Sequence, residues 1–460
     1  MKSYPKEIFK AYDIRGVVGK TLTESVVEDI GQALGSMAQE KGLERMVIAR
    51  DGRLSGPALT NALAKGLQKA GIKVLDIGMV PTPVLYFATF FLDTGSGIAI
   101  TGSHNPPEYN GLKIMLGGDT LYGPMIQAIR ERLEQGNMTE IQGGTYEEVD
   151  VREAYLQRIV SDIHLKRPLH IAIDCGNGVP GNLAPELYRR LGCTVDELYC
   201  EVDGTFPNHH PDPSRPENLK DLTAALQKSS AEIGLAFDGD GDRLGVVTKS
   251  GKNIFSDRQL MLFAEDLLSR HRGATIIFDV KSTAKLKPWI EQHGGVPLLW
   301  KTGHSFIKSK MKETGALLAG EMSGHIFFKE RWYGFDDGLY AAARLLEILS
   351  RSDDIEAVFN RLPEALNTPE LRLELSEGEQ YAFIEKMQKE AKAFEGAERV
   401  IDIDGLRVEY PDGFGLMRAS NTTPTVIFRF EGDNEEVLSR IQDTFKTVIT
   451  KVFPDVRLPF

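Results

Sequence analysis

The sequence has few cysteines, no long apolar run and no excess of positive charge. Its three cysteines, Cys175, Cys193 and Cys200, are an odd number and too few for a disulfide-stabilised scaffold. No stretch approaches the roughly 18 consecutive apolar residues of a transmembrane helix, and the opening segment has no apolar signal core. We therefore expect a protein of the reducing cytoplasm that makes no contact with a membrane.

The net charge is −12 and the pI about 5.4. An acidic chain repels nucleic acid and anionic membrane surfaces, because binding a polyanion requires a basic face. Hydrophobic residues make up 42% of the chain and charged residues 26%, which is the balance of a folded globular protein. A small anionic substrate would require cationic side chains gathered at one site.

One strand–loop–helix–glycine–strand pattern occurs three times in the chain. The copies begin with MVIARDGRLSG, LHIAIDCGNGVPG and ATIIFDVKST, and their first strands end at Asp51, Asp174 and Asp279. Alternation of strands and helices at this spacing predicts βαβ units in mostly parallel sheets, and the glycine after each helix suits a C-terminal cap. The three aspartates are 123 and 105 residues apart, so each copy has the size of a domain.

The last part of the chain lacks this opening pattern. LRLEL, RVEYPDGFGLMRAS and TVIFRFEG predict antiparallel strands, and YAFIEKMQKEAKAF and EEVLSRIQDTFKTVI predict helices. The predicted fold class is α/β, with three similar α/β domains of mixed, mostly parallel sheets followed by an α+β domain. A chain of 460 residues has room for three or four domains, and we expect them at 1–149, 150–252, 253–364 and 365–460.

A polar loop follows the apolar run GIAI in the segment GSGIAITGSHNPPEYNGLKI. A serine in such a loop, here Ser103, can present its hydroxyl as a nucleophile, and His104 and Lys113 could neutralise charge or transfer protons beside it. The alternative is an ordinary turn, since Ser, Asn and Pro are all turn formers. The segment contains no G-x-S-x-G motif, which argues against a serine hydrolase.

Three aspartates, Asp238, Asp240 and Asp242, alternate with glycines in IGLAFDGDGDRLGVV. In an extended segment their side chains would point the same way, and three such close carboxylates repel one another unless a cation lies between them. The two intervening glycines would let the backbone curve round such an ion. Oxygen ligands favour Mg²⁺ or Mn²⁺ over zinc. A calcium EF-hand is excluded, because its sixth and twelfth positions hold Arg243 and Lys249. A solvated acidic turn is the alternative to a metal site.

Two further polar loops suggest sugar and phosphate contacts. In GEMSGH, Glu321, Ser323 and His325 alternate and could hydrogen-bond neighbouring hydroxyls of a sugar, although a structural turn explains them equally well. In RASNTTP, an arginine fork is followed by hydroxyl and amide side chains, which suits a phosphate dianion; the alternative is a polar turn between strands. Cationic residues also lie in or near glycine-rich segments: Arg15, Lys113, Arg243, Lys281, His304, His325 and Arg418.

Together these segments resemble the α-D-phosphohexomutase family over essentially the whole chain. The motifs TGSHNP, DGDGDR, GEMSGH and RASNTTP occur in the family's order, and FKAYDIRGVVG, EVDGTFPNHHPDP, KTGHSFIK and KERWYGFDDG add to the similarity. The resemblance implies four domains around a central cleft. It also implies an isomerase that interconverts the 1-phosphates and 6-phosphates of mannose and glucose.

The resemblance implies a role for each motif. Ser103 would be the phosphoserine and would share one Mg²⁺ with Asp238, Asp240 and Asp242. His104, Lys113 and Arg15 would serve the chemical step, and the first two are candidates for proton transfer. Glu321 and Ser323 would bind the sugar hydroxyls O3 and O4. The remaining substrate contacts would be Tyr12, Arg243, Lys281, His304, His325, Arg418, Ser420, Asn421 and Thr422.

In the implied reaction, phospho-Ser103 donates its phosphate to a hexose monophosphate and a 1,6-bisphosphorylated sugar forms. This intermediate turns end for end and returns its other phosphate to the serine, so glucose 1,6-bisphosphate or an equivalent serves as intermediate and activator. Hexose phosphates are the expected partners of a monomer. A phosphoglucosamine mutase is one alternative, but its motif has Gln where this chain has Met322. A non-catalytic sugar-phosphate sensor is the other, against which the serine and the aspartates argue.

Overall fold

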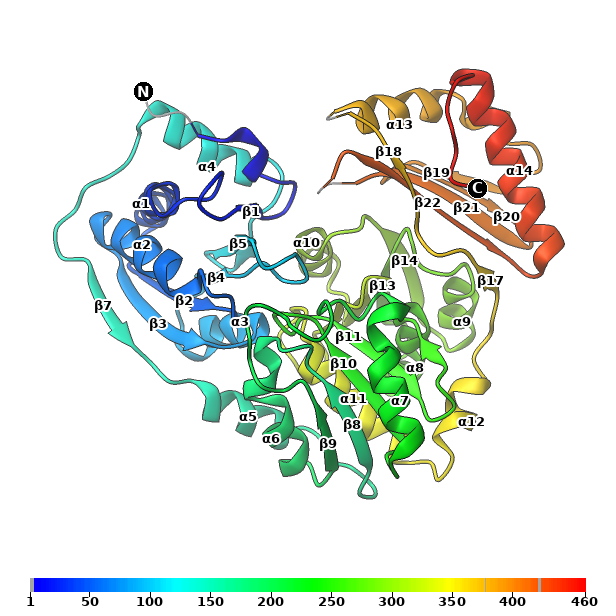
Figure 1. Ribbon diagram of the computed structural model, residues 1–460, viewed down its shortest axis with the longest axis horizontal. Coiled ribbons are helices and arrows are strands. Elements are labelled where there is room, and N and C mark those ends of the chain that lie inside the picture. The colour runs from blue at the N-terminus through cyan, green and yellow to red at the C-terminus, as the bar shows by residue number, and fades with distance from the viewer. Residues whose placement is uncertain (1–3, 377, 421–422) are drawn as a thin grey trace.

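The computed structural model describes residues 4–376, 378–420 and 423–460, and over these residues the chain builds four sheets in sequence order. Figure 1 shows the first unit in blue and cyan and the last in orange and red, with the two middle units between and below them. The N-terminus lies in the first unit and the C-terminus in the last. The chain therefore forms four units in sequence order.

The first sheet has the strand order β1-β5-β4-β2-β3-β7, with β6 paired to β5. The pairs β2–β3, β2–β4 and β3–β7 are parallel, whereas β4–β5 and β1–β5 are antiparallel. The strands of this unit are β1 Ile14–Val17, β2 Arg45–Arg50, β3 Lys73–Met79, β4 Gly97–Ile100, β5 Tyr109–Leu116, β6 Asp119–Thr120 and β7 Thr145–Glu148. Its helices are η1 Lys6–Ile8, α1 Glu24–Glu40, α2 Gly56–Lys69, α3 Thr82–Phe91 and α4 Pro124–Gln135.

The second sheet has the order β12-β11-β10-β8-β9 and the third the order β14-β13-β15-β16. The strands are β8 His170–Asp174, β9 Thr194–Leu198, β10 Ile233–Phe237, β11 Leu244–Thr248, β12 Asn253–Ile254, β13 Thr275–Asp279, β14 Val296–Trp300, β15 Leu318–Gly320 and β16 Ile326–Phe328. The helices are α5 Arg152–Val160, η2 Val179–Asn182, α6 Ala184–Arg190, η3 Pro216–Leu219, α7 Lys220–Lys228, α8 Ser256–Leu268, α9 Leu286–Gln292, α10 His304–Thr314, α11 Gly338–Leu349 and α12 Ile355–Asn360.

The fourth sheet is antiparallel throughout the described residues, in the order β17-β22-β21-β20-β19 with β18 paired to β22. This confirms the predicted α+β unit. Its strands are β17 Leu366–Asn367, β18 Leu371–Glu374, β19 Arg399–Ile401, β20 Leu406–Tyr410, β21 Gly413–Ala419 and β22 Thr425–Gly432. Its helices are α13 Glu379–Lys389, η4 Ala391–Ala393 and α14 Glu435–Val452.

The three predicted βαβ repeats are present. In each, two parallel strands flank a helix: β2-α2-β3, β8-α6-β9 and β13-α9-β14. The glycines that follow these helices, Gly71, Gly192 and Gly294, have φ angles of 81°, 93° and 82°. Side chains other than glycine rarely adopt this left-handed conformation. The glycine in each repeat is therefore what lets the chain turn from the helix into the second strand.

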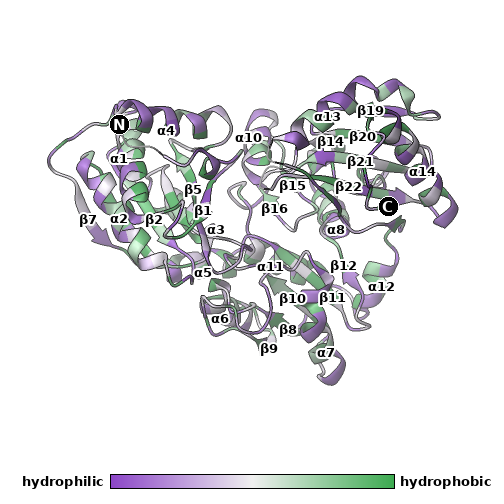
Figure 2. Ribbon diagram, turned by 45° about the horizontal axis from the view of Figure 1, so that its top comes forward, coloured by the Kyte–Doolittle hydropathy of each residue, from purple (hydrophilic) through white to green (hydrophobic). Residues whose placement is uncertain are grey.

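Residues of strand β2 alternate between two hydrophobic cores. Met46 and Ile48 pack with helices α1 and α2, whereas Val47 and Ala49 face helix α3. The second of these cores continues through the sheets of the second and third units, so the first three units share buried apolar contacts. In Figure 2 the strands inside the units are mostly green, while many outer helix faces are purple.

The fourth unit has a hydrophobic core of its own. Its apolar contact with the third unit is a smaller cluster around Val280, Phe414 and Leu416. Hydrogen bonds add to this cluster: the buried Arg407 donates to the carbonyls of Val280 and Ser282, both at 2.7 Å. None of the helices among the described residues is long and apolar enough to span a membrane.

Candidate active site

The loop after strand β4 holds Ser103 in an unusual backbone conformation. Ser103 is buried and has a φ of 49°, in the left-handed region that residues with a side chain rarely occupy. Its backbone N–H donates to Thr101 Oγ1 at 2.8 Å. The Asp51 carboxylate in turn accepts from the Thr101 hydroxyl at 3.0 Å and from Gly102 N–H at 2.9 Å. The aspartate at the end of strand β2 thus fixes the start of the serine loop.

Arg53 fixes the rest of this loop. Its guanidinium is fully buried and ion-pairs with Asp51 at 3.1 Å. It also donates to four backbone carbonyls, at 2.9, 2.6, 2.5 and 3.0 Å, which belong to Ser103, Asn105, Pro106 and Tyr109. Arg53 was not predicted from the sequence, because its partners in the loop are backbone carbonyls, which every residue type carries.

The three aspartates follow strand β10 and converge. Ligand atoms of Asp238, Asp240 and Asp242 all lie within 4.8 Å of one another, and the three side chains are completely buried. Residues 239–241 form a turn rather than an extended segment, and Gly241 has a φ of 78°, so the intervening glycines curve the backbone as the sequence predicted. Asp238 Oδ1 closes the turn by accepting from Gly241 N–H and Arg243 N–H at 3.0 and 3.2 Å. The turn, and not strand alternation, brings the carboxylates together.

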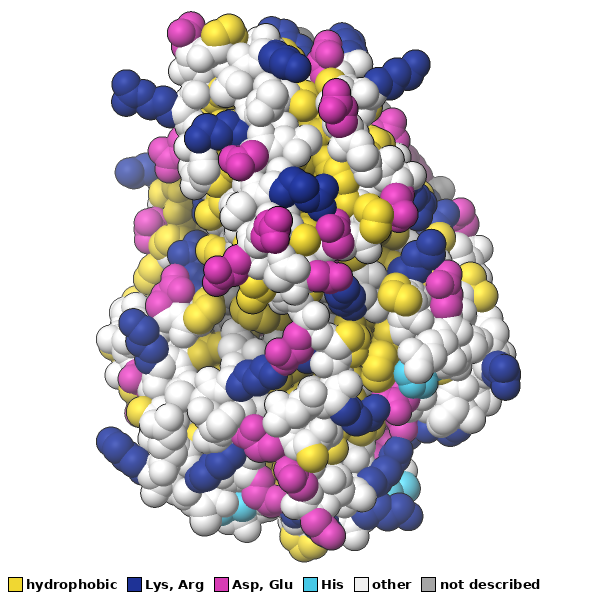
Figure 3. All heavy atoms as spheres, turned by 90° about the vertical axis from the view of Figure 1, so that its right-hand side faces the viewer, with side chains coloured by type: hydrophobic (Ala, Val, Ile, Leu, Met, Phe, Trp, Pro, Cys, Tyr) yellow, Lys and Arg dark blue, Asp and Glu magenta, His cyan; other side chains and the backbone are white. Residues whose placement is uncertain are grey.

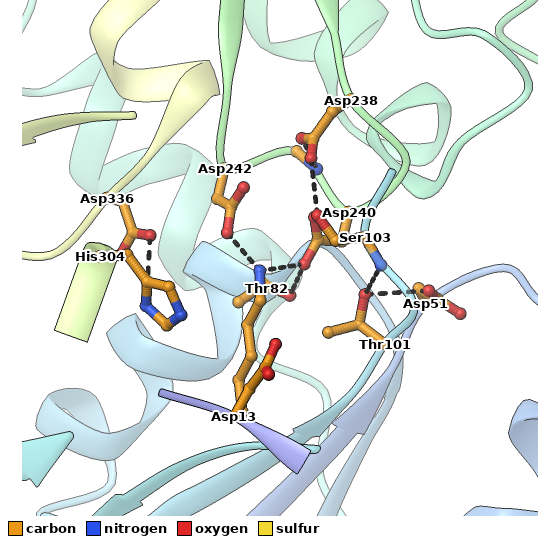
Figure 4. Close-up of polar contacts among 12 residues, drawn as sticks. Asp13, Asp51, Thr82, Thr101, Ser103, Asp238, Asp240, Asp242, His304 and Asp336 are labelled. Atoms are coloured by element: carbon orange, nitrogen blue, oxygen red, sulfur yellow. Dashed lines mark hydrogen bonds and ion pairs between the residues drawn. The ribbon is translucent and has the colours of Figure 1, made fainter. Parts of the chain in front are cut away.

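The serine and the aspartates meet at one point, between the first and second units (Figure 4). Ser103 Oγ donates to Asp238 Oδ2 at 3.0 Å. Lys113, on the neighbouring strand β5, ion-pairs with Asp240 at 2.8 Å and Asp242 at 2.5 Å. Thr82 Oγ1, at the start of helix α3, donates to Asp240 Oδ2 at 2.6 Å. Loops about 135 residues apart in the sequence therefore share one set of polar contacts.

The carboxylates differ in how firmly they hold a negative charge. Burial, together with the charges of Asp242 and Asp240, raises the pKa of Asp238 well above its ordinary value. Burial also acts to raise the pKa of Asp242, but the charges of Lys113 and His325 outweigh it and hold that pKa well below the ordinary value. Asp238 is thus the carboxylate that most lacks a compensating cation.

A divalent cation fits this cluster. Among the described residues, Asp240 Oδ1 is buried and has no hydrogen-bond partner, and leaving a buried carboxylate oxygen unpaired is costly. Carboxylate oxygens are the ligands that Mg²⁺ prefers. Ser103 Oγ lies next to these oxygens, so a phosphate on the serine would lie against the same cation. The donor set thus fits a hard divalent metal.

His104 and Arg15 lie on the other side of Ser103. His104 Nδ1 is 3.1 Å from Ser103 Oγ, and burial together with the charges of Arg243 and Arg15 lowers the pKa of His104 well below its ordinary value. This imidazole is therefore neutral near pH 7. Arg15 ion-pairs with Asp13 at 2.6 Å and also donates to the side chain of Asn105, so it borders the serine loop.

The loop after strand β15 adds a third group of side chains. His325 Nδ1 is 3.0 Å from Glu321 Oε2 and 3.0 Å from Ser323 Oγ, and its Nε2 is 3.2 Å from Asp242 Oδ1. Burial acts to lower the pKa of His325, but the charge of Asp242 outweighs it and the pKa rises to about 9. Glu321 Oε1 accepts from Gly303 N–H at 2.5 Å. His325 thus links Glu321 and Ser323 to the aspartate cluster.

Tyr12 and His304 connect the first unit to the third. Their rings are in edge-to-face contact, with centroids 5.3 Å apart. His304 lies at the start of helix α10 and 3.9 Å from Asp336, which also pairs with Lys308 at 2.9 Å. Neither Asp336 nor Lys308 was predicted as a site residue, although Asp336 belongs to the motif KERWYGFDDG.

Two cations of the third and fourth units are paired with carboxylates of the fourth. Arg418 ion-pairs with Asp404 at 3.2 Å, and Lys281 of the third unit pairs with Glu370 at 2.8 Å. The charge of Arg418 counteracts the rise that burial causes in the pKa of Tyr12. Ser420 Oγ accepts from Thr423 N–H at 3.2 Å. The predicted phosphate contacts Asn421 and Thr422 lie outside the described residues.

Of the predicted residues, a first set is in mutual contact at the junction of the first three units: Ser103, His104, Lys113, Arg15, Asp238, Asp240, Asp242, Arg243, Glu321, Ser323 and His325. Tyr12 and His304 adjoin it, whereas Lys281, Arg418 and Ser420 lie toward the fourth unit. On the face drawn in Figure 3, Lys and Arg are interspersed with Asp and Glu. Cationic side chains are therefore concentrated in the site and not on that face.

A buried serine hydroxyl beside a carboxylate cluster that fits a divalent metal, with several cations around it, is typical of an enzyme that handles phosphate groups. Comparison with known proteins is more specific. Four consecutive parts of the chain match "Phosphoglucomutase/phosphomannomutase" domains: alpha/beta/alpha domain I at 6–140, domain II at 153–251, domain III at 255–366 and the C-terminal domain at 370–448.

Two curated relatives and one solved structure illustrate the similarity. The chain is 60% identical over 451 residues to a phosphoglucomutase of Neisseria gonorrhoeae, with 98% of each chain covered. It is 54% identical over 457 residues to the phosphomannomutase/phosphoglucomutase of Pseudomonas aeruginosa, covering 99% of this chain and 98% of that one. A crystal structure of a phosphoglucomutase/phosphomannomutase family protein from Burkholderia thailandensis is 55% identical, covers both chains completely and superposes with a TM-score of 0.95.

The chain belongs to the phosphoglucomutase/phosphomannomutase family. The predicted fold, the isomerase class and the hexose phosphate mutase reaction are therefore confirmed, as is the resemblance to bacterial proteins that carry both activities in their names.

Proposed function

We propose that Ser103 carries the phosphate that this mutase passes to and from hexose phosphates, beside a Mg²⁺ held by Asp238, Asp240 and Asp242. The observation that supports this most directly is the 3.0 Å contact between Ser103 Oγ and Asp238 Oδ2 within a buried aspartate cluster. The left-handed φ of Ser103 adds support, because backbone strain is retained where the surrounding structure enforces it, and such strain clusters at active sites.

The cation supplies neutralisation of charge on the transferred phosphate when it is bound. The protein's own side chains do the rest. A hydroxyl of the hexose monophosphate attacks the phosphorus of phospho-Ser103, and Ser103 Oγ leaves. Arg15 and Arg243 face the serine loop and the aspartates, where they stabilise the equatorial oxygens of the phosphate.

Proton transfer falls to His104 and Lys113. The neutral His104, 3.1 Å from Ser103 Oγ, can accept a proton from the attacking hydroxyl. Lys113 stays protonated, because the charges of Asp240 and Asp242 outweigh its burial and raise its pKa well above the ordinary value. A protonated lysine beside Ser103 suits the return step, in which the leaving oxygen must be neutralised.

Glu321 and Ser323 would read the sugar. Glu321 is held by Gly303 N–H and His325, so its carboxylate is fixed in orientation. Binding through O3 and O4 would leave the C2 hydroxyl, the one that differs between glucose and mannose, outside the contact. This supports action on both sugars. Met322, between these two residues, has no group that would bind an amino sugar, which argues against a phosphoglucosamine mutase.

The second phosphate would lie toward the fourth unit. Arg418 offers a guanidinium fork, and Ser420 lies two residues further along, with Asn421 and Thr422 completing the predicted group. Tyr12, Lys281, His304 and His325 line the way between the two ends. A 1,6-bisphosphorylated hexose such as glucose 1,6-bisphosphate could then be held in either direction, and would also serve to phosphorylate an empty Ser103.

The test is replacement of Ser103 with alanine. We expect Ser103→Ala to lose glucose 1-phosphate isomerisation by several orders of magnitude in a coupled assay, because the phosphate carrier is gone. Mass spectrometry of the purified protein should find phosphate on Ser103. Ser36→Ala is the matched control: Ser36 is a buried serine of helix α1 in the same unit and should leave turnover unchanged. Full activity of Ser103→Ala would exclude the covalent scheme.

Mannose and glucose phosphates, tested in competition, address the choice of sugar. Comparable kcat/KM for both would support dual specificity, whereas faster turnover of glucosamine phosphate would contradict it. The domain boundaries, the monomeric state and the cytoplasmic location stay predictions from the sequence.

A further inference from the structure

Two cysteines lie side by side behind the active site. Cys175 directly follows strand β8 and Cys200 closely follows strand β9, and these strands are parallel neighbours. The two sulfur atoms are 3.4 Å apart. Cys175 is completely buried, Cys200 is partly exposed, and both are free thiols. The third cysteine, Cys193, precedes strand β9 and is buried at the opposite end of the same sheet.

The loop that begins at Cys175 supports the aspartate turn. Val179 N–H donates to the carbonyl of Gly239, between two of the aspartates, at 3.1 Å. Gly178 packs so closely that a Cβ placed on it would lie 2.9 Å from Gly239 Cα. Gly178 N–H in turn donates to the Cys175 carbonyl at 2.7 Å. Movement of Cys175 therefore has a short route to the backbone of the metal-binding turn.

The loop that contains Cys200 supports the serine loop. A Cβ on Gly204 would lie 2.8 Å from Arg53 Cα, and one on Gly52 would lie 2.4 Å from a methyl carbon of Val202. Arg53 is the residue that holds the carbonyl of Ser103. The two cysteines thus lie between the loop that supports the aspartate turn and the loop that supports the serine loop.

We propose that Cys175 and Cys200 form an intrachain disulfide on exposure to hydrogen peroxide, and that this disulfide weakens metal binding and turnover. The thiolate of the more exposed Cys200 attacks the peroxide O–O bond, which gives a sulfenic acid and, after protonation, one water. The sulfur of the Cys175 thiol then attacks the sulfenic sulfur of Cys200 and forms the S–S bond, while the sulfenic hydroxyl takes up the Cys175 proton and leaves as a second water. Two thiols and one peroxide thus become one disulfide and two waters.

The bond requires the sulfur atoms to approach from 3.4 Å to about 2.05 Å. The loops that bear the cysteines pack tightly through Gly178 and Gly204, so a backbone shift that accompanies this approach acts on residues 239 and 53. Cys175 is buried and Cys200 is partly exposed, so peroxide reaches the Cys200 sulfur first.

The disulfide itself does not depend on the proposed roles of the site, whereas the loss of metal affinity does. The folded, reduced enzyme is treated with peroxide and then analysed by intact mass, by peptide mapping and by Mg²⁺ titration of activity. We expect a species two hydrogens lighter, a Cys175–Cys200 cross-linked peptide and a Mg²⁺ requirement about tenfold higher. Dithiothreitol should reverse all three.

Two variants make the result specific. Cys193→Ser should oxidise as the natural chain does, whereas Cys200→Ser should neither form the cross-link nor lose Mg²⁺ affinity under peroxide. Absence of the cross-linked peptide in enzyme that stays folded by circular dichroism would refute the disulfide. Formation of the cross-link with an unchanged Mg²⁺ requirement and unchanged kcat would refute its coupling to the site, and leave the role of Ser103 untouched.

Discussion

Replacement of Arg53 with lysine tests whether the buried guanidinium holds Ser103 in its working geometry. Arg53 donates to four loop carbonyls, including that of Ser103 at 2.9 Å, and pairs with Asp51. A lysine keeps the charge beside Asp51, but one ammonium group cannot reach carbonyls that are spread over residues 103–109. The variant should therefore release the loop without leaving the buried carboxylate unpaired.

The size of the effect follows from the backbone of Ser103. Its φ of 49° costs a residue with a side chain roughly 1–2 kcal/mol. Without the clamp, the loop relaxes toward unstrained conformations and gives up about that free energy. Since about 1.4 kcal/mol corresponds to a factor of ten in population, the working geometry becomes roughly 5- to 30-fold rarer. We expect kcat to fall by the same factor and KM to change little, because the predicted sugar contacts lie on other loops.

The assay compares kcat and KM for glucose 1-phosphate with the fraction of Ser103 that carries phosphate, measured by mass spectrometry. Arg344→Lys is the matched control. Arg344 is equally buried and pairs with Glu330 at 2.7 Å within the third unit, away from the serine loop. It should lower the Tm without lowering kcat at a temperature where both variants are folded. An Arg53→Lys enzyme with the natural kcat would refute the clamp, and one with a raised KM alone would assign Arg53 to substrate binding instead.

Three further predictions concern the metal, the phosphate and pH. Asp240→Asn should raise the Mg²⁺ concentration for half-maximal activity about tenfold or more, because one charged ligand becomes neutral; an unchanged titration would remove Asp240 from the metal site. Arg418→Lys should raise KM about tenfold and leave kcat within a few-fold, because the lysine loses the bidentate fork; a loss in kcat alone would contradict a binding role. Burial raises the pKa of Asp337 from 3.8 to about 7. Between these pH values the folded state retains a proton that the unfolded chain releases. The stability of the fold therefore falls as the pH rises from about 4 to 7. Asp337→Asn removes this dependence, and its Tm relative to the natural chain should climb between pH 5 and 8; parallel Tm curves would contradict the shift.

Much of the fold could be predicted because its signals are local. Strands that end in Asp51, Asp174 and Asp279, each followed by a helix and a glycine, define βαβ units by residue type and spacing alone. The fourth unit could be distinguished because its predicted strands lack that aspartate and the loop that follows it. The sharing of one core by the first three units was not predictable, since it depends on which sheet faces meet.

The residues of the site likewise divide into those that could be predicted from the sequence and those that could not. Ser103 and the aspartates lie in motifs of distinctive composition, and their residue types indicate their chemistry. Arg53, Thr82, Asp336 and Lys308 escaped notice because their partners are distant in sequence or are backbone atoms. For the aspartates the sequence left two geometries open, since strand alternation and a glycine turn both bring alternate carboxylates together; the structure has the turn.

The strand-ending aspartates show that the repeat in the sequence is also a repeat of function. Asp51 accepts from Thr101 and Gly102 of the serine loop. Asp279 accepts from Thr302 Oγ1 at 3.0 Å and from Met322 N–H, in the loop after strand β15, at 3.2 Å. In both units the aspartate binds loops that follow other strands of its own sheet, so one carboxylate fixes several loops at the same edge.

The cations of the site are paired with carboxylates of the protein, which bears on how a bisphosphorylated sugar could turn within it. Arg418 pairs with Asp404, Lys281 with Glu370, and Arg243 lies 3.8 Å from both Asp212 and Asp238. Each carboxylate holds its cation in place and competes with an incoming phosphate. On the proposed function, this competition lowers the affinity for the intermediate while keeping the cations ordered. A mutase that must release its intermediate, reverse it and bind it again benefits from cations that are positioned in advance and only moderately attractive.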